Sequence, residues 1–122
     1  MDQEREAELP VCSPWPPLKD RRLIGQAETS ELAGLFKVLA SDTRLRLLHA
    51  LAKSGRLCVT ELAEAVGMKP QAVSNQLQRL LDRGILKATR HRNNIQYRIV
   101  DPCVLSLLEL ALCPIQEAER RT

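Results

Sequence analysis

The segment from Thr60 to about Arg83 constrains the fold more than any other part of this 122-residue chain. A short amphipathic stretch ends at Gly67, and a longer one starts at Pro70 after the tight turn GMK. Proline is favourable at the start of a helix, where the backbone nitrogen has no helical partner. Apolar residues recur at helical spacing along the longer stretch, and Gly84 closes it. They are Val73, Leu77, Leu80 and Leu81. The pattern predicts two helices joined by a tight turn.

A basic hairpin follows this pair of helices. The runs ILKATRH and IQYRIV predict two short strands, joined by Arg92, Asn93 and Asn94. Asparagine tolerates positive φ, so the Asn pair suits a tight turn. Short helix, tight turn, longer helix and hairpin together predict a winged helix-turn-helix, a fold that places its second helix in the major groove of DNA.

The charge pattern favours DNA as the partner. Residues 69–98 hold seven Lys or Arg and one acid, Asp82, while the rest of the chain is acidic on balance. A basic block in a folded segment is typical of a surface that binds a polyanion, although many charge runs are only solvated faces. The outer side of the second helix carries groups that bind base edges and phosphates, and the hairpin tip suits backbone or minor-groove contact. We expect DNA contacts from Lys69, Gln71, Ser74, Asn75, Gln78 and Arg79, and from Arg90, His91, Arg92 and Asn93.

The remaining segments complete a mainly α chain with one small β-hairpin. Residues 1–17 hold four acids and four prolines and are expected to form a flexible arm. Helices are predicted over 19–27, from Thr29 or Ser30 to about residue 40, and from Ser41-Asp42 to Ser54. The last helix, which Asp101 and Pro102 begin, is apolar on nearly every side, and this favours a subunit interface. The domain is expected to span 18–118, with a tail at 119–122.

Several other function classes do not fit. The chain has three aromatic residues (Trp15, Phe36 and Tyr97), too few to grip single strands by stacking. We find no nucleophile–base arrangement, glycine-rich phosphate loop or carboxylate pair, so we do not expect an enzyme. The longest apolar stretch is too short to cross a membrane, and the acidic start favours a cytoplasmic protein. Because the cytoplasm is reducing, the four cysteines are expected to be free thiols, metal ligands or redox sensors.

Two stretches carry a family resemblance. LAGLFKVLASDTRLRLLHAL, followed by VTELAEAVGMKPQAVSNQLQRLLDRGIL, resembles the ArsR/SmtB family of bacterial metal-sensing repressors over residues 31–112. The resemblance implies a homodimer joined by its first and last helices. It also implies repression of a resistance or efflux operon until an inducer binds, and two-fold symmetry predicts an inverted-repeat operator. The family's DNA-contacting Ser-His pair matches Ser74 and Asn75, so the histidine is replaced.

Cys58 stands where the family places a metal ligand. Members that sense soft metals often carry Leu-Cys-Val-Cys before the first helix of the motif, and residues 57–60 read Leu-Cys-Val-Thr. The resemblance implies that Cys12, from the arm of the opposite subunit, completes the site. Thiolates select polarizable ions such as As(III), Hg(II), Cd(II), Pb(II) or Cu(I). Alternatively, Cys58 is a small buried residue, with Thr60 as the N-cap of the helix.

A second family site lies on the last helix, and its hard-metal ligands are not retained here. Cys103 takes the place of a histidine, and Pro114 stands where another is expected. Cys103 and Cys113 then form a secondary thiol set. Their ten-residue separation puts them on different faces, which excludes a pair within one helix. The alternative is that Cys103 and Cys113 only pack at the subunit interface.

The sequence therefore predicts a repressor released by a thiophilic ion. The alternative is a repressor switched by thiol oxidation or persulfide. Some relatives pair a cysteine late in the last helix with one at the position of His49, so the match here is half. We expect His49 to be packed or capped rather than a ligand. The identity of the ion and the operon lie beyond the sequence.

Overall fold

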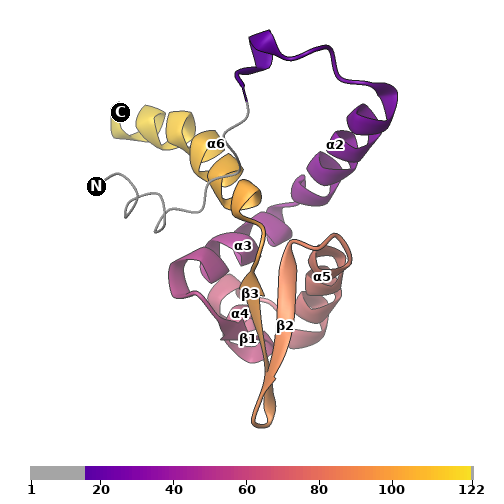
Figure 1. Cartoon of the computed structure of the whole chain (residues 1–122). Coiled ribbons are helices and arrows are strands. Elements are labelled where there is room, and N and C mark those ends of the chain that lie inside the picture. The colour runs from indigo at the N-terminus through magenta and orange to yellow at the C-terminus, as the bar shows by residue number, and fades with distance from the viewer. Residues whose placement is uncertain (1–15, 122) are drawn as a thin grey trace, which may run out of the picture. The chain divides into compact units, whose positions relative to one another are not determined.

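The computed structural model describes residues 16–121, which fall into two compact units (Figure 1). Residues 16–100 form the first unit, and a long helix from residue 101 onward belongs to the second. Each unit is considered by itself. The predicted arm lies almost entirely outside the described residues, and Cys12 lies there too.

The first unit has the predicted winged helix-turn-helix architecture, with a small antiparallel sheet against the helical core. Its elements are η1 (Leu18–Asp20), α2 (Gln26–Leu39), α3 (Asp42–Ser54), β1 (Leu57–Cys58), α4 (Val59–Val66), α5 (Pro70–Asp82), β2 (Leu86–His91) and β3 (Asn94–Ile99). The helix of the second unit is α6 (Pro102–Arg121).

The start of α2 differs from the prediction. The expected helix over 19–27 is wrong, because residues 22–25 have no regular structure between η1 and α2. Gly25 is the extended N-cap of α2, and its amide donates to Oε1 of Glu28 at 3.0 Å. Thr29 lies inside the helix, and its hydroxyl donates to the carbonyl of Gly25 at 2.7 Å. The first turn is therefore held from Gly25, four residues before the expected cap.

Helix α3 begins and ends as predicted, and its inner face is the centre of the core. The hydroxyl of Ser41 accepts from the amide of Arg44 at 3.3 Å, and Gly55 ends the helix with φ of 86°. The burial of apolar side chains is the main favourable contribution to the stability of a domain of this size. The fully buried side chains of the first unit are Leu47, Leu48, Leu51, Leu62, Val73, Leu77, Leu80 and Ile85.

The sheet contains a strand that the sequence did not predict. Its order is β1-β3-β2, all antiparallel, and in β1 Leu57 lies opposite Tyr97 while Cys58 lies opposite Gln96. In the hairpin His91 pairs with Asn94, so the loop has two residues. The expected positive φ at the asparagine pair is wrong, because Asn94 is in β3 and Arg92 takes the positive φ of 61°.

Helix α6 starts at the predicted cap and extends past the expected domain end at residue 118. Oδ1 of Asp101 accepts from the amides of Cys103 and Val104 at 3.0 and 3.3 Å. Val104 is buried, but Leu110 is 73% and Ile115 58% exposed. In the part of the chain that the structure describes, no helix combines the length and hydrophobicity required to span a bilayer.

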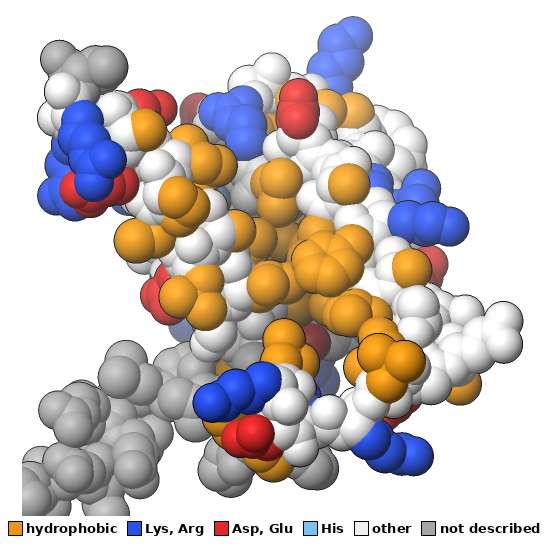
Figure 2. Space-filling view, turned by 90° about the horizontal axis from the view of Figure 1, so that it is seen from above, with side chains coloured by type: hydrophobic (Ala, Val, Ile, Leu, Met, Phe, Trp, Pro, Cys, Tyr) orange, Lys and Arg blue, Asp and Glu red, His pale blue; other side chains and the backbone are white. Residues whose placement is uncertain are grey.

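Large apolar side chains are also exposed on the first unit. Leu32 and Phe36 of α2 keep almost half of their surface accessible, and Leu45 of α3 keeps 37%. Hydrophobic side chains can be seen at the molecular surface in Figure 2, where they are coloured orange. An apolar surface of this kind is typical of a protein–protein interface.

Candidate nucleic-acid interface

The turn between α4 and α5 sets the direction of the second helix. Gly67 adopts the left-handed conformation with φ of 70°, and the amide of Met68 donates back to the carbonyl of Ala63 at 3.0 Å. This is a glycine C-cap, in which positive φ carries little steric cost. Lys69 is then extended, and Pro70 opens α5. The helix is therefore aimed by backbone geometry as well as by packing.

Helix α5 has one buried face and one polar face, as the sequence predicted. Val73, Leu77 and Leu80 are buried, whereas Leu81 is only half-buried. On the polar face, the side-chain amide of Gln71 donates to Oδ1 of Asn75 at 3.3 Å, and the side-chain amide of Gln78 donates to Oδ1 of Asp82 at 2.8 Å. Ser74 is half-buried, while the other predicted contacts are exposed: Lys69, Gln71, Asn75, Gln78 and Arg79.

The hairpin of β2 and β3 presents the second predicted group. Its base is held by buried Leu86 and Tyr97, and its tip projects away from the core (Figure 1). The predicted tip residues are all exposed: Arg90, His91, Arg92 and Asn93. The positive φ of Arg92 holds its side chain on a two-residue loop. Two elements thus present cations and amides, the groups that contact phosphates and base edges.

Arg44 is a buried cation that the sequence analysis did not single out. It is 7% exposed; its Nε donates to the carbonyl of Val38 at 2.6 Å, and its Nη1 donates to Oε1 of Gln76 at 2.6 Å. Burial, and then the charge of Arg79, lower the pKa of Arg44. A sequence signal existed, because Arg44 stands one turn before Leu47 and Leu48 on the stripe that faces the core.

Arg83 makes a similar connection at the end of α5. Its Nη2 donates to the carbonyl of Glu31 at 2.6 Å and lies 3.4 Å from a carboxylate oxygen of the same residue. Glu31 is in α2, so this arginine joins the first helix to the second helix of the motif. In the sequence, Arg83 is one of the seven basic residues within 69–98 and carries no further signal.

The cysteines occupy separate places. Cys58 is half-buried and free, and as the N-cap residue of α4 it donates from its amide to Oε1 of Glu61 at 2.9 Å. Thr60 is therefore not the cap, because α4 starts one residue earlier, at Val59. Cys113 is exposed and free, whereas Cys103 is disulfide-bonded. Ten residues of helix rise about 15 Å, so Cys103 and Cys113 of one α6 cannot share an ion.

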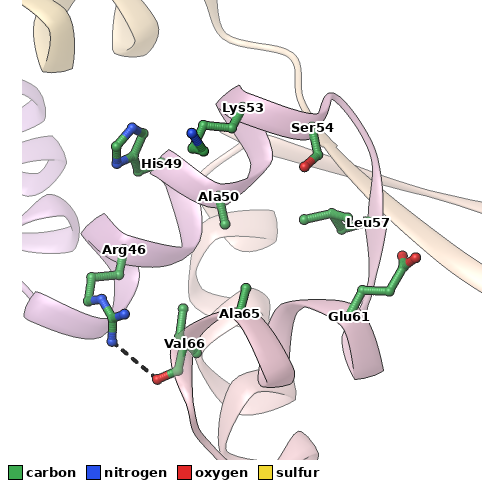
Figure 3. Close-up of a pocket in the computed structure, with 9 residues that line it drawn as sticks. All are labelled: Arg46, His49, Ala50, Lys53, Ser54, Leu57, Glu61, Ala65 and Val66. Atoms are coloured by element: carbon green, nitrogen blue, oxygen red, sulfur yellow. Dashed lines mark hydrogen bonds between the residues drawn. The ribbon is translucent and has the colours of Figure 1, made fainter.

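His49 lies on the wall of an open pocket between α3 and α4 (Figure 3). The pocket has a volume of about 350 Å³, and Arg46 and Lys53 line it on the same helix. Arg46 also donates to the carbonyl of Val66 at 3.1 Å. The expectation that His49 is packed is wrong, because its side chain is exposed. Across residues 16–121, no three His, Cys, Asp or Glu side chains are grouped to hold a metal ion.

Comparison with known proteins identifies the family. A model described as "Bacterial regulatory protein, arsR family" matches residues 41–88. A "Transcriptional repressor SmtB homolog" of Synechocystis sp. is 32% identical over 118 residues, covering 92% of this chain and 89% of that protein. The chain belongs to the arsR family. Members of this family are DNA-binding regulators rather than enzymes. Further relatives are named for cadmium, arsenic and mercury resistance.

Solved structures agree with this assignment to the arsR family. The crystal structure of the AntR antimony-specific transcriptional repressor is 72% identical, with a TM-score of 0.78, and the match covers 90% of this chain and 99% of that one. A homodimeric winged helix-turn-helix domain from Mycobacterium bovis is 30% identical, with a TM-score of 0.69, covering 82% of this chain and 96% of that one.

Proposed function

We propose that this protein is a homodimeric repressor that binds operator DNA and dissociates from it when it binds a soft metal or metalloid ion. Trivalent antimony is the first candidate for this ion. The observation that carries the proposal is the 72% identity with an antimony-specific repressor over nearly the whole chain. The chemistry agrees, since the chain has four cysteines and thiolates prefer polarizable ions.

Release follows from linkage. If the ion binds better to a dimer whose recognition helices are misaligned, it must weaken DNA binding by the same factor. Coupling free energies of about 1–3 kcal/mol are typical, which corresponds to roughly 5–150-fold in operator affinity. The operator is expected to be an inverted repeat, because a two-fold dimer presents two copies of α5.

The sequence-based assignment of the thiolates is Cys58 with Cys12 of the opposite subunit. Cys58 is a free thiol at the N-cap of α4, the helix that the turn at Gly67 joins to α5. An ion held there acts on the motif within a few residues. A carboxylate of the same cap, Glu61, is already engaged by the amide of Cys58 at 2.9 Å, so the thiol is the ligand that remains.

Helix α6 offers the second assignment. Cys103 and Leu110 are seven residues apart and lie on nearly the same face, and Cys113, three residues beyond Leu110, lies on the adjoining face. If two α6 helices pack antiparallel about a midpoint near residue 108, Cys103 of one subunit approaches Cys113 of the other. Leu110 is 73% exposed in the single chain, which supports an apolar partner for this face.

Serine substitutions distinguish the two assignments. Reduced protein is titrated with antimonyl tartrate, As(III), Cd(II) and Zn(II), and thiolate charge-transfer absorption and operator release are followed together. The first assignment predicts that Cys58→Ser abolishes both while repression stays intact, and that mixed Cys12→Ser and Cys58→Ser subunits recover about half of the absorption. The second predicts these losses for Cys113→Ser instead. Release by none of the four ions in wild-type protein would refute the proposal.

Thiol oxidation is the second candidate function, and the disulfide at Cys103 is the observation that favours it. In this case a thiol oxidant or an organic polysulfide releases the operator, and a dithiol reductant restores binding. Cys103→Ser then blocks the response to oxidant, and the titration with soft ions leaves the operator bound.

A further inference from the structure

Two arginines connect α2 directly to α5. We infer that Arg44 and Arg83 form a clamp that sets the position of the recognition helix against α2, and that they act as positioning residues for operator binding and its release. The inference rests on the proposed function for the release step alone, because operator binding is a property of the family. Below, "the clamp" means these two side chains with their partners in α2 and α5.

Arg44 forms one end of the clamp. Val38 lies in the last turn of α2, where backbone carbonyls have no helical partner and the helix dipole favours a cation. Arg44 donates to this carbonyl and also to Gln76 of α5, both at 2.6 Å. The donors of a guanidinium are held in one rigid plane. A shift of Val38 relative to Gln76 therefore breaks one of the two bonds.

Arg83 forms the other end of the clamp, at the last turn of α5. Nη2 donates to the carbonyl of Glu31, and the guanidinium covers Gly34 on the next turn of α2. A Cβ placed on Gly34 would lie 2.8 Å from Nη1 of Arg83. The arginine therefore occupies space that a glycine leaves open, and its side chain is 24% exposed.

The clamp reaches the surface that a partner subunit is proposed to cover. Arg83 lines a shallow hollow of about 450 Å³ with Leu32 and Leu35 of α2. Leu32 is 45% exposed in the single chain, and α3 is the main neighbour of α2 in the first unit. A second subunit that packs on this face of α2 also touches Arg83. Movement at the subunit interface is thereby passed to α5 through a side chain that contacts both.

Gly34→Ala is the sharpest test of the clamp. The added methyl group displaces the guanidinium of Arg83, which is the flexible end of a side chain, so the fold is retained. Alanine is also the better helix former, so α2 itself is not weakened. Gly25→Ala is the control for a glycine-to-alanine change whose Cβ meets nothing within 4 Å. Because Gly25 is the N-cap of α2 and lies outside the helix, the thermal stability of each variant is compared with that of wild-type protein.

The measurements use full-length dimer and a DNA fragment selected by the wild-type protein from a random pool. We expect Gly34→Ala to bind this fragment at least about fivefold more weakly than Gly25→Ala, the lower end of a typical coupling. The ratio of DNA affinities without and with antimonyl tartrate should shrink. The midpoint of thermal unfolding should not fall below the wild-type value, and the dimer mass and the affinity for antimonyl tartrate should stay at the wild-type values, which a merely structural role would not predict.

Arg83→Ala and the double variant Gly34→Ala/Arg83→Ala complete a double-mutant cycle with Gly34→Ala. If both changes act through one contact, Gly34→Ala/Arg83→Ala binds DNA no more weakly than Arg83→Ala alone. Arg83→Lys, with a slimmer side chain, should restore binding in the Gly34→Ala background. DNA affinities of Gly34→Ala and Arg83→Ala equal to that of Gly25→Ala would overturn the inference. If antimonyl tartrate leaves wild-type protein on DNA, the proposed function fails, and the ion-free affinities still decide on the clamp.

Discussion

At the scale of single residues, Arg44 shows how a charge can be part of the core. Replacing it with methionine keeps most of the apolar stem and removes hydrogen bonds to the Val38 carbonyl and to Gln76. Hydrogen bonds that involve a charge contribute about 1.5–3 kcal/mol each, so the loss of both in Arg44→Met should lower the free energy of unfolding by about 3–6 kcal/mol. Urea denaturation measures this. Arg46→Met is the control, because that exposed arginine makes one such bond, to Val66; equal losses would contradict the argument.

The sequence predicted which side chains are exposed better than it predicted the contacts of the buried ones. The exposure of Asn75 and Arg90 could be predicted because periodicity and charge show which side of a helix or hairpin faces out. Arg44 and Arg83 could not, because their partners in α2 lie far away in the sequence and a lone arginine is more often solvated. The role of Cys58 stays a prediction, since its proposed partner, Cys12, lies outside the described residues.

At the scale of elements, α5 and the hairpin should differ in what they contribute to DNA binding. Asn75 is exposed on α5 and is proposed to contact base edges, so Asn75→Ala should cost about 1–3 kcal/mol with the selected operator and little with random DNA. Glu64→Ala is a control on the exposed side of α4. Competition binding against both DNAs separates the effects, and equal losses on the two would place Asn75 on phosphate rather than on a base.

The hairpin should act through charge alone. Arg90→Ala and Arg92→Ala should weaken specific and random DNA nearly equally and reduce the salt slope by about one unit each. Arg92→Gly separates charge from backbone strain, since glycine takes φ of 61° without cost. It should lower DNA affinity as much as Arg92→Ala, with a higher unfolding midpoint. A salt slope that stays at the wild-type value would place the tip away from DNA.

Element boundaries were predictable where a side chain or glycine fixes them. Ser41, Gly55, Gly67 and Pro70 mark helix ends in the sequence and in the structure. The start of α2 was not predictable, since Gly25 caps it through its backbone and through Glu28. Strand β1 was missed because two residues carry no periodicity, and it exists only through pairing with β3, about forty residues later.

At the scale of the whole molecule, the proposed dimer determines whether DNA is bound at all. Phe36 is 47% exposed on α2, so Phe36→Glu should leave the fold intact and produce monomers in sedimentation. Such a monomer contacts one half-site, and its affinity for an inverted repeat should fall at least about a hundredfold, since linked sites gain 10²–10⁴ in avidity. Lys37→Glu, next to it on the exposed side, is the control. A monomeric wild-type protein would rule out the two-fold model.

The two-residue strand β1 has a mechanical consequence. Its register places Cys58 opposite Gln96 in β3, the inner strand of the hairpin. The hairpin is thus joined at its base to the segment that carries this thiol. A displacement of residue 58 must either break the two residue pairs between β1 and β3 or move the hairpin together with α4. An ion bound at Cys58 would therefore act on both elements that are proposed to contact DNA, with no relay through the interior.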